Sequence, residues 1–143
     1  MNQHITVSYQ SIYPRIKNLR SLKSFLEIIC RQEGYVLDTL SLVFCSDDYL
    51  HSINVQYLNH DTFTDIITFD YSTTPSSVNG ELYISYERVI ENAANVKTSI
   101  NRELHRVIFH GLLHLLGYKD KLKNDIETMR LKEEYYLIMY FSK

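Results

Sequence analysis

Two histidines four residues apart interrupt the apolar stretch VIFHGLLHLLGYKD, which spans residues 107–120. Residues i and i+4 lie on one face of a helix, about 5–6 Å apart at Cβ, so His110 and His114 have the spacing to chelate one metal ion. Asp120 would miss them on a continuing helix, but Gly117 permits the left-handed turn that ends a helix. Two imidazoles and a carboxylate leave a fourth position open for water, which is the arrangement of a catalytic zinc site.

Histidine pairs with this spacing also arise by chance as polar residues on the rim of a helix. The apolar flanks, Gly117 and Asp120 favour the metal site over that alternative here. His105 lies five residues before His110 and off its face, so we expect it to be a surface residue. No role is assigned to the isolated histidines: His4, His51 and His60.

The same spacing occurs in metzincin peptidases, which carry a glutamate directly after the first histidine. That glutamate is the general base that takes the proton of the metal-bound water. This chain has Gly111 in its place. The pattern therefore predicts a metal site on a metzincin-like helix, while a metallopeptidase is only an alternative interpretation.

Composition predicts one ordinary globular domain, residues 1–143, with 45% hydrophobic and 22% charged residues. The net charge of −2 gives no general attraction to nucleic acid, so nucleic-acid binding would require a local basic patch. Cys30 and Cys45 lie in apolar surroundings and are expected to be buried free thiols of a reducing compartment. No apolar run has membrane-spanning length and MNQHITVSYQ has no signal-peptide core, so we expect a cytoplasmic protein with no membrane partner.

Hydrophobic periodicity predicts an α+β fold, with a sheet that is covered by helices. Alternating and β-branched segments predict about four strands, at residues 5–10, 39–45, 63–71 and 80–86. Amphipathic segments predict about five helices, at residues 13–34, 46–59, 85–97, 100–117 and 122–141. The stretch STTPSSVN, residues 72–79, is predicted to be a loop.

The sequence resembles the YbeY family of bacterial endoribonucleases and rRNA maturation factors. HGLLHLLGYKD matches that family's pattern H-G-x-L-H-L-x-G-Y-D-H at most positions. INVQYLNHDTFTDIITFD resembles its L-N-x-x-Y-R…P-T-D-V-L-S-F stretch, and GELYIS resembles its G-D-I-x-I-S strand. Met129 and Glu133 fit the helix that follows the metal site, so the resemblance covers roughly residues 40–137.

The resemblance implies a small mixed β-sheet with helices and one divalent metal ion, most simply zinc, held by three side chains. It also implies cleavage of single-stranded RNA, including the 3′ end of small-subunit (16S) rRNA, and a part in ribosome quality control. The implied partners are small-subunit rRNA and the ribosome or its assembly factors. A non-catalytic ribosome-binding module, in which the metal only ties the last two helices to the sheet, is a further alternative.

Two departures from the family pattern concern charge. Asp120 stands where the family has its third histidine, and Lys119 replaces the aspartate before it. A carboxylate ligand adds negative charge, so the metal should polarise its water less, and metals that accept oxygen ligands become alternatives to zinc. Leu58 occupies a position where the family usually has an arginine suited to RNA phosphate.

RNA contacts must then come from other residues. Lys119, Lys121 and Lys123 cluster beside the proposed site and are candidates to bind phosphate, with the basic first helix as the alternative path. Thr64 and Asp65 either line the site or only stabilise the start of their strand. The proposed nucleophile is metal-bound water or hydroxide, attack by the RNA 2′-hydroxyl is the alternative, and no general base is assigned.

Overall fold

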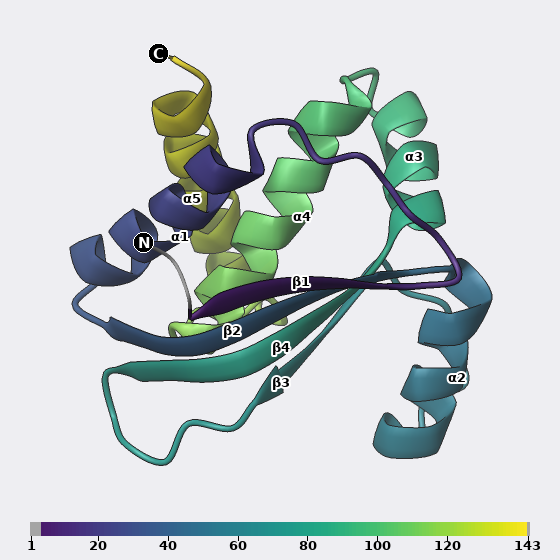
Figure 1. Ribbon diagram of the computed structural model, residues 1–143, viewed down its shortest axis with the longest axis horizontal. Coiled ribbons are helices and arrows are strands. Elements are labelled where there is room, and N and C mark those ends of the chain that lie inside the picture. Colours follow the sequence, from purple (N-terminus) through teal and green to yellow (C-terminus); the bar gives the residue numbers. More distant parts are fainter. Residues whose placement is uncertain (1–3, 143) are drawn as a thin grey trace.

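The structure is a computed structural model that describes residues 4–142, and these form one four-stranded sheet and five helices (Figure 1). The strands are β1 (Ile5–Gln10), β2 (Val36–Cys45), β3 (Ile66–Asp70) and β4 (Ser77–Ser85). The helices are α1 (Leu19–Gln32), α2 (Asp47–Leu58), α3 (Tyr86–Asn95), α4 (Ile100–Leu115) and α5 (Lys123–Phe141). The predicted α+β fold is confirmed.

The sheet is mixed, with the strand order β1-β2-β4-β3. β2 pairs in parallel with both β1 and β4, and Leu42 lies opposite Val7 on one side and Leu82 on the other. β3 pairs with β4 in the antiparallel direction, with Thr68 opposite Leu82. Since parallel strands need crossover connections, α1 and α2 with β3 fill the intervals between β1, β2 and β4.

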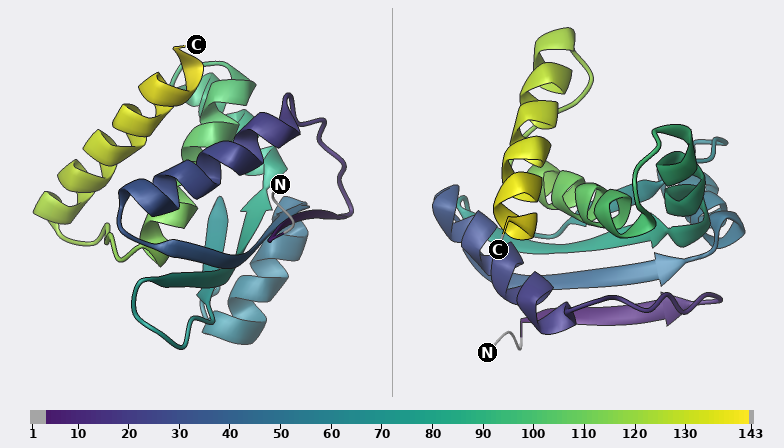
Figure 2. Two further views of the ribbon diagram at one scale, coloured as in Figure 1. Left: turned by 60° about the vertical axis from the view of Figure 1, so that its left-hand side comes forward. Right: turned by 90° about the horizontal axis from the view of Figure 1, so that it is seen from above.

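Helices cover the two faces of the sheet unequally. α1, α4 and α5 lie over one face, and α2 lies against the other (Figures 1 and 2). The alternation of side chains along β4 follows this division, because Leu82 and Ile84 belong to the main core and Tyr83 packs with the small cluster under α2. Each fully buried Leu or Ile side chain contributes about 1.5–3 kcal/mol, so the α1/α4/α5 face holds most of the stabilising apolar burial.

α4 is the helix on which the candidate site depends. Ser99 caps its start by accepting a hydrogen bond from the backbone N–H of Arg102 at 3.0 Å. Gly111 lets the helix approach the sheet closely, because a Cβ there would lie 2.5 Å from Cδ1 of Ile66 and 3.1 Å from Leu82. The histidines on either side of this contact are therefore held close to the start of β3.

Several element boundaries differ from those predicted. β2 begins at Val36 rather than at residue 39, and β3 spans Ile66–Asp70 rather than residues 63–71. α1 begins at Leu19 rather than near residue 13, because Asn18 adopts a left-handed conformation (φ 53°) that interrupts the chain before the helix. β4 begins three residues before Gly80, because residues 77–79 pair with residues 36–39 of β2. Part of the predicted 72–79 loop is therefore strand, since a parallel partner satisfies its backbone despite its loop-like composition.

The two cysteines have the environment that the sequence predicts. Cys30 and Cys45 are buried, unpaired thiols, and burial raises the pKa of each to about 12. Thiols held in the protonated form are poor nucleophiles, so neither is a candidate for catalysis. Within residues 4–142, no helix combines the length and apolar character needed to cross a membrane.

Candidate metal centre

The chain reverses direction immediately after α4. Gly117 has φ +98°, and its N–H donates to the carbonyl of His114 at 3.0 Å. The N–H of Tyr118 donates to the carbonyl of Leu113, also at 3.0 Å. This pair of hydrogen bonds is the Schellman motif, which needs a left-handed residue of the kind that glycine supplies. The predicted helix end at Gly117 is confirmed, and the turn returns the chain toward the histidines.

The turn brings Asp120 to the two imidazoles. Nε2 of His110 and Nε2 of His114 are 3.0 Å apart. Oδ2 of Asp120 lies 3.1 Å from Nε2 of His114 and 3.2 Å from Nε2 of His110. The three ligand-type atoms therefore form a nearly equilateral triangle. All three residues are partly buried.

The outer nitrogen of each ring fixes where its proton lies. Nδ1 of His114 donates to the carbonyl oxygen of Tyr118 at 3.0 Å, and a carbonyl can only accept. Nδ1 of His110 donates to a carboxylate oxygen of Glu133 at 2.5 Å. Both Nε2 atoms consequently direct lone pairs toward each other and toward the Asp120 carboxylate. Three converging lone pairs repel one another unless a cation lies between them.

The donor set fits one divalent metal ion. Tetrahedral coordination with bonds of about 2.0–2.1 Å places neighbouring ligand atoms about 3.3 Å apart. The three separations here, 3.0, 3.1 and 3.2 Å, are close to that value. Two imidazole nitrogens and one carboxylate oxygen are ligands that zinc accepts, and a carboxylate or carbonyl behind each ring is the usual outer partner of a metal-binding histidine.

A partly buried ion network holds Glu133 in place. Arg106 binds Glu103 through two hydrogen bonds of 2.9 and 2.7 Å, and it donates to the second oxygen of Glu133 at 3.1 Å. Burial disfavours the charged guanidinium, but the two carboxylates outweigh that effect and raise the pKa of Arg106. Glu133 thus has one oxygen on Arg106 and the other on His110, which fixes the imidazole.

Thr64 and Asp65, which the sequence suggested as substrate contacts, differ in their placement. Asp65 lies 3.8 Å from the Arg106 guanidinium, and burial raises the pKa of its carboxyl group against the opposing effects of Arg106 and His110. Its carbonyl accepts the backbone N–H of Ser85 at 2.9 Å, which anchors the start of β3. The Thr64 hydroxyl makes a local bond of 3.4 Å to the carbonyl of Ile66. Only Asp65 therefore joins the network beside the metal group.

A second polar cluster anchors the turn that carries Asp120. The Tyr118 hydroxyl donates to Glu33 at 2.7 Å, Lys132 pairs with the same carboxylate at 2.9 Å, and the Tyr136 hydroxyl also donates to it. Burial alone would raise the pKa of Glu33, but these donors together lower it. The turn is thereby tied to the end of α1 and to α5.

A cavity of about 290 Å³ opens beside the metal group. It is lined by Arg106, His110, Asp120, Ile126, Met129, Arg130 and Glu133. The three lysines proposed for RNA binding are exposed near Asp120 and do not line this cavity. Arg106 was missed in the sequence, although it lies one helical turn before His110 on the same face. Arg130 had no comparable local signal, because α5 folding back on α4 brings it to the cavity.

The prediction that His105 is a surface residue was wrong. Its exposed fraction is 1%, and its ring stacks on Tyr140 with a centroid separation of 4.9 Å. Nδ1 of His105 donates to the carbonyl of Asn101 at 2.7 Å. The error arose because α4 was expected to have one buried face, whereas α3, α5 and the sheet pack around it and the start of α1 lies over His105.

Fold and site together define an α+β protein whose central helix and following turn form a two-histidine, one-carboxylate group suited to a divalent cation. A family model described as endoribonuclease YbeY matches residues 5–140. The chain belongs to this family.

The matches to similar proteins cover most of the chain. The endoribonuclease YbeY of Flavobacterium johnsoniae is 41% identical over 136 residues, which cover 95% of this chain and 96% of the relative. That of Christiangramia forsetii is 46% identical over 112 residues, 78% of each chain. The solution structure of TM1509 from Thermotoga maritima has a TM-score of 0.69 at 28% identity and covers 95% of this chain and 89% of its own. These matches confirm the family resemblance found in the sequence.

Proposed function

We propose that this protein is a metal-dependent endoribonuclease that cleaves single-stranded RNA, with one divalent ion, most simply zinc, held by His110, His114 and Asp120. The observation that carries the proposal is the convergence of three lone-pair atoms at 3.0–3.2 Å while both outer ring nitrogens donate to acceptors. The family to which the chain belongs supplies the reaction class, which is hydrolysis of RNA phosphodiester bonds.

The residues around the metal group have two proposed roles: some orient the imidazole ligands, and Arg130 supplies a positive charge. A bound zinc ion supplies a Lewis acid that polarises water or a phosphate oxygen and stabilises developing negative charge. Glu133 and the Tyr118 carbonyl keep both imidazoles oriented toward the ion. Arg130 lines the adjacent cavity and has no ion-pair partner within residues 4–142, so it is available for an RNA phosphate.

The RNA strand is proposed to approach over the turn that follows α4. Lys119, Lys121 and Lys123 are exposed there, and three cations next to a hydrolytic site would attract a phosphate backbone that the net charge of −2 does not. Asp65, which lies beside Arg106 just before β3, and its neighbour Thr64 are proposed to limit the path of the strand.

In the cell, the proposed role is maturation of the 3′ end of small-subunit rRNA and ribosome quality control. The partners would be small-subunit rRNA and the ribosome or its assembly factors, in the cytoplasm. This role rests on membership of the YbeY family and on the single-strand specificity proposed above.

A metallopeptidase is disfavoured by the packing around Gly111. The peptidase pattern requires a glutamate at that position, but a Cβ there would lie 2.5 Å from Ile66 and 3.1 Å from Leu82. A carboxylate in this contact would also be buried against apolar side chains, which costs free energy. The general base of a peptidase therefore has no space in this fold.

The test compares three substrates with one preparation of zinc-loaded protein. A single-stranded RNA, the same RNA annealed to its complement, and an unstructured peptide are incubated before and after the metal is removed by a chelator. We expect that only the single strand is cleaved, that cleavage is lost on chelation, and that zinc restores it. Peptide cleavage would favour a peptidase, and no cleavage of any substrate by zinc-loaded protein would favour a non-catalytic module.

A further inference from the structure

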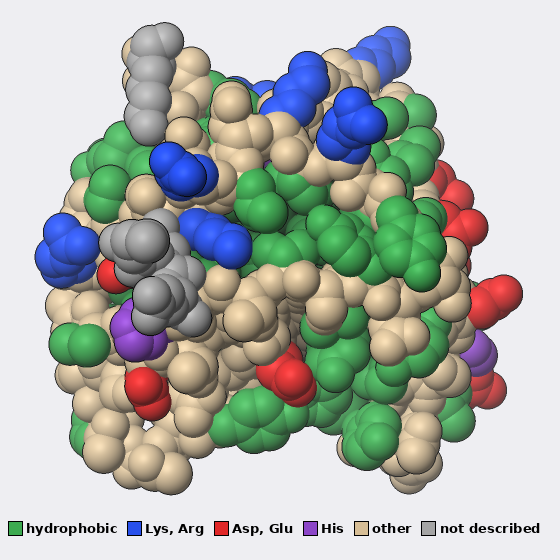
Figure 3. All heavy atoms as spheres, viewed as in Figure 1, with side chains coloured by type: hydrophobic (Ala, Val, Ile, Leu, Met, Phe, Trp, Pro, Cys, Tyr) green, Lys and Arg blue, Asp and Glu red, His purple; other side chains and the backbone are tan. Residues whose placement is uncertain are grey.

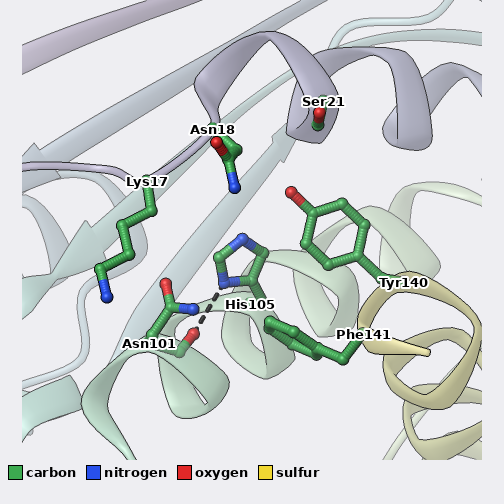
Figure 4. A pocket seen from close by; sticks show the side chains of 7 residues that line it. All are labelled: Lys17, Asn18, Ser21, Asn101, His105, Tyr140 and Phe141. Carbon is green, nitrogen blue, oxygen red and sulfur yellow. Dashed lines mark hydrogen bonds between the residues drawn. The ribbon is translucent and has the colours of Figure 1, made fainter. Parts of the chain in front are cut away.

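A second cavity lies between the start of α1, the first turn of α4 and the end of α5 (Figure 4). Its volume is about 280 Å³. It is lined by Lys17, Asn18, Ser21, Asn101, His105, Tyr140 and Phe141. His105 lies about one and a half helical turns before His110, and none of these residues lines the cavity beside the metal group.

The His105 ring at the floor of this cavity has an unused nitrogen. Within residues 4–142, Nε2 of His105 is the one buried side-chain nitrogen or oxygen without a hydrogen-bond partner. Nδ1 donates to the Asn101 carbonyl, and burial lowers the pKa of the ring, so the neutral ring presents a lone pair at Nε2. Leaving such an acceptor unpaired costs free energy, which a ligand that donates a hydrogen bond would recover.

The rim of the cavity is positively charged. Lys17 is the charged residue among those that line it, and no carboxylate does so. The side chain of Asn18 makes no capping hydrogen bond, so the first N–H groups of α1 lack that partner at the positive end of the helix dipole. In Figure 3, most Lys and Arg side chains lie in the upper half of the face, and Asp and Glu lie mainly lower and along the right-hand edge. The rim therefore favours an anion.

Floor and rim together restrict the chemistry of the ligand. The lone pair of His105 would repel an anion that has no proton to donate, and Lys17 would repel a cation. A ligand that satisfies both carries an anionic oxygen and, close to it, a hydroxyl donor. The volume is near the lower end of those found for small-molecule sites, which limits the ligand to about one nucleotide unit.

We propose that this cavity binds one ribonucleotide unit, with its phosphate at Lys17 and the start of α1 and its 2′-hydroxyl donating to Nε2 of His105. The choice of a ribonucleotide among hydroxylated anions rests on the proposed function. The vicinal hydroxyl is present in RNA and absent from DNA, so the cavity would give the protein a contact that distinguishes the two away from the metal group. Asn18 and Ser21, which lie above the His105 ring in Figure 4, are proposed as further hydrogen-bond donors to the phosphate.

The test uses uridine 3′-monophosphate and its 2′-deoxy counterpart as probes. Each is titrated into the whole protein, and affinity is measured by calorimetry while the ring nitrogens of the histidines are followed by NMR. We expect the ribonucleotide to shift Nε2 of His105 and to bind about fivefold more tightly than the deoxy compound, the value for one neutral hydrogen bond of about 1 kcal/mol. Equal affinities, or a ribonucleotide that moves only the His110 and His114 signals, would overturn the proposal.

Variants separate the two contacts. His105→Phe keeps an aromatic ring beside Tyr140 and should abolish the preference for the ribonucleotide. Lys17→Gln changes an exposed residue, so it tests the phosphate contact even if the His105 variant does not fold, and it should weaken both probes equally. Lys23→Gln removes the same charge from α1 outside the cavity and should leave both affinities unchanged. Equal losses in the Lys17 and Lys23 variants would contradict the proposed site.

A longer probe identifies the source of the ribonucleotide. If an RNA strand is the natural occupant, an uncleaved short oligoribonucleotide ending in the same unit should bind more tightly than the mononucleotide and still shift His105. If free nucleotide is the occupant, the longer probe should gain nothing. Both outcomes support a ribonucleotide site, and neither depends on RNA cleavage, so the metal-dependent activity can fail or succeed separately.

Discussion

His110 and His114, toward the end of α4, have contacts at both ring nitrogens, whereas His105, nearer its start, has a partner at only one. At the end of the helix, carboxylates and a carbonyl surround the rings and select a cation. At its start, Lys17 and the unpaired nitrogen of His105 line one cavity, and no carboxylate lines it. The comparison shows that the groups facing each nitrogen, more than the spacing of histidines along the helix, determine what each ring can bind.

The largest expected effect comes from removing a ring at the end of α4. His110→Ala or His114→Ala deletes one of three ligands, so bound zinc should fall to background and RNA cleavage should disappear, while the buried leucines beside them keep the helix packed. Elemental analysis of purified protein and an RNA cleavage assay measure both effects. His60→Ala, at an exposed histidine outside the group, should change neither. Undiminished metal in both α4 variants would refute the metal centre.

Removing the acceptor behind His110 should have the next largest effect. Glu133→Gln keeps the size of the side chain but removes the negative charge that accepts the hydrogen bond from Nδ1 of His110. Loss of such outer partners typically lowers metal affinity about 10–100-fold. Competition with a chromophoric chelator measures the affinity. Glu134→Gln is a matched control, because the neighbouring Glu134 is exposed and pairs with Arg102. Equal affinities in the two variants would mean that Glu133 does not position the ligand.

RNA binding can compare the basic residues that follow α4 with those on and just before α1. Replacing Lys119, Lys121 and Lys123 by glutamine should weaken binding about tenfold and flatten its salt dependence, because each lost phosphate contact lowers the slope for single strands by about 0.7. Metal content should stay unchanged. The matched set on the other side is Arg15, Arg20 and Lys23, also replaced by glutamine. A larger loss in that second set would place the main RNA path along α1.

His105→Phe should have the smallest effect among these variants. It changes how the free energy of unfolding depends on pH. Burial lowers the pKa of the native His105 ring, so below about pH 6.5 the unfolded chain takes up a proton that the folded protein resists. The free energy of unfolding is therefore highest above about pH 6.5, and it decreases as the pH falls below that value. The phenylalanine variant lacks this loss, so denaturant unfolding at pH 7.5 and 5.5 should show a smaller drop than in the wild type, with a gain of at most about 1 kcal/mol at pH 7.5. His60→Phe should keep the wild-type drop, and an identical drop in the His105 variant would mean that the native ring protonates freely.

Much of the fold follows from local sequence patterns. The Ser46 cap of α2 and the left-handed Gly117 after α4 are local features, and the structure has both. α1 was predicted too long because nothing local shows that Asn18 turns left-handed after Pro14. The start of β4 was missed because its pairing partner, β2, lies about 40 residues earlier in the chain.

The same distinction applies to the site. His110, His114, Gly117 and Asp120 lie within eleven residues, so their convergence could be expected from helix geometry and one turn. The residues that complete it come from distant segments, because Glu133 reaches His110 only when α5 folds back on α4. The burial of His105 likewise depends on α1 and α5 covering α4, which no spacing within the helix reveals.

The most direct measurement is the anomalous scattering of a crystal grown with zinc, recorded on both sides of the zinc absorption edge. We expect one peak about 2 Å from Nε2 of His110, Nε2 of His114 and a carboxylate oxygen of Asp120. Nδ1 of each ring should remain on Glu133 and on the Tyr118 carbonyl. A well-ordered crystal with no peak at this position, or with zinc bound by other residues, would contradict the metal centre on which the proposed activity depends.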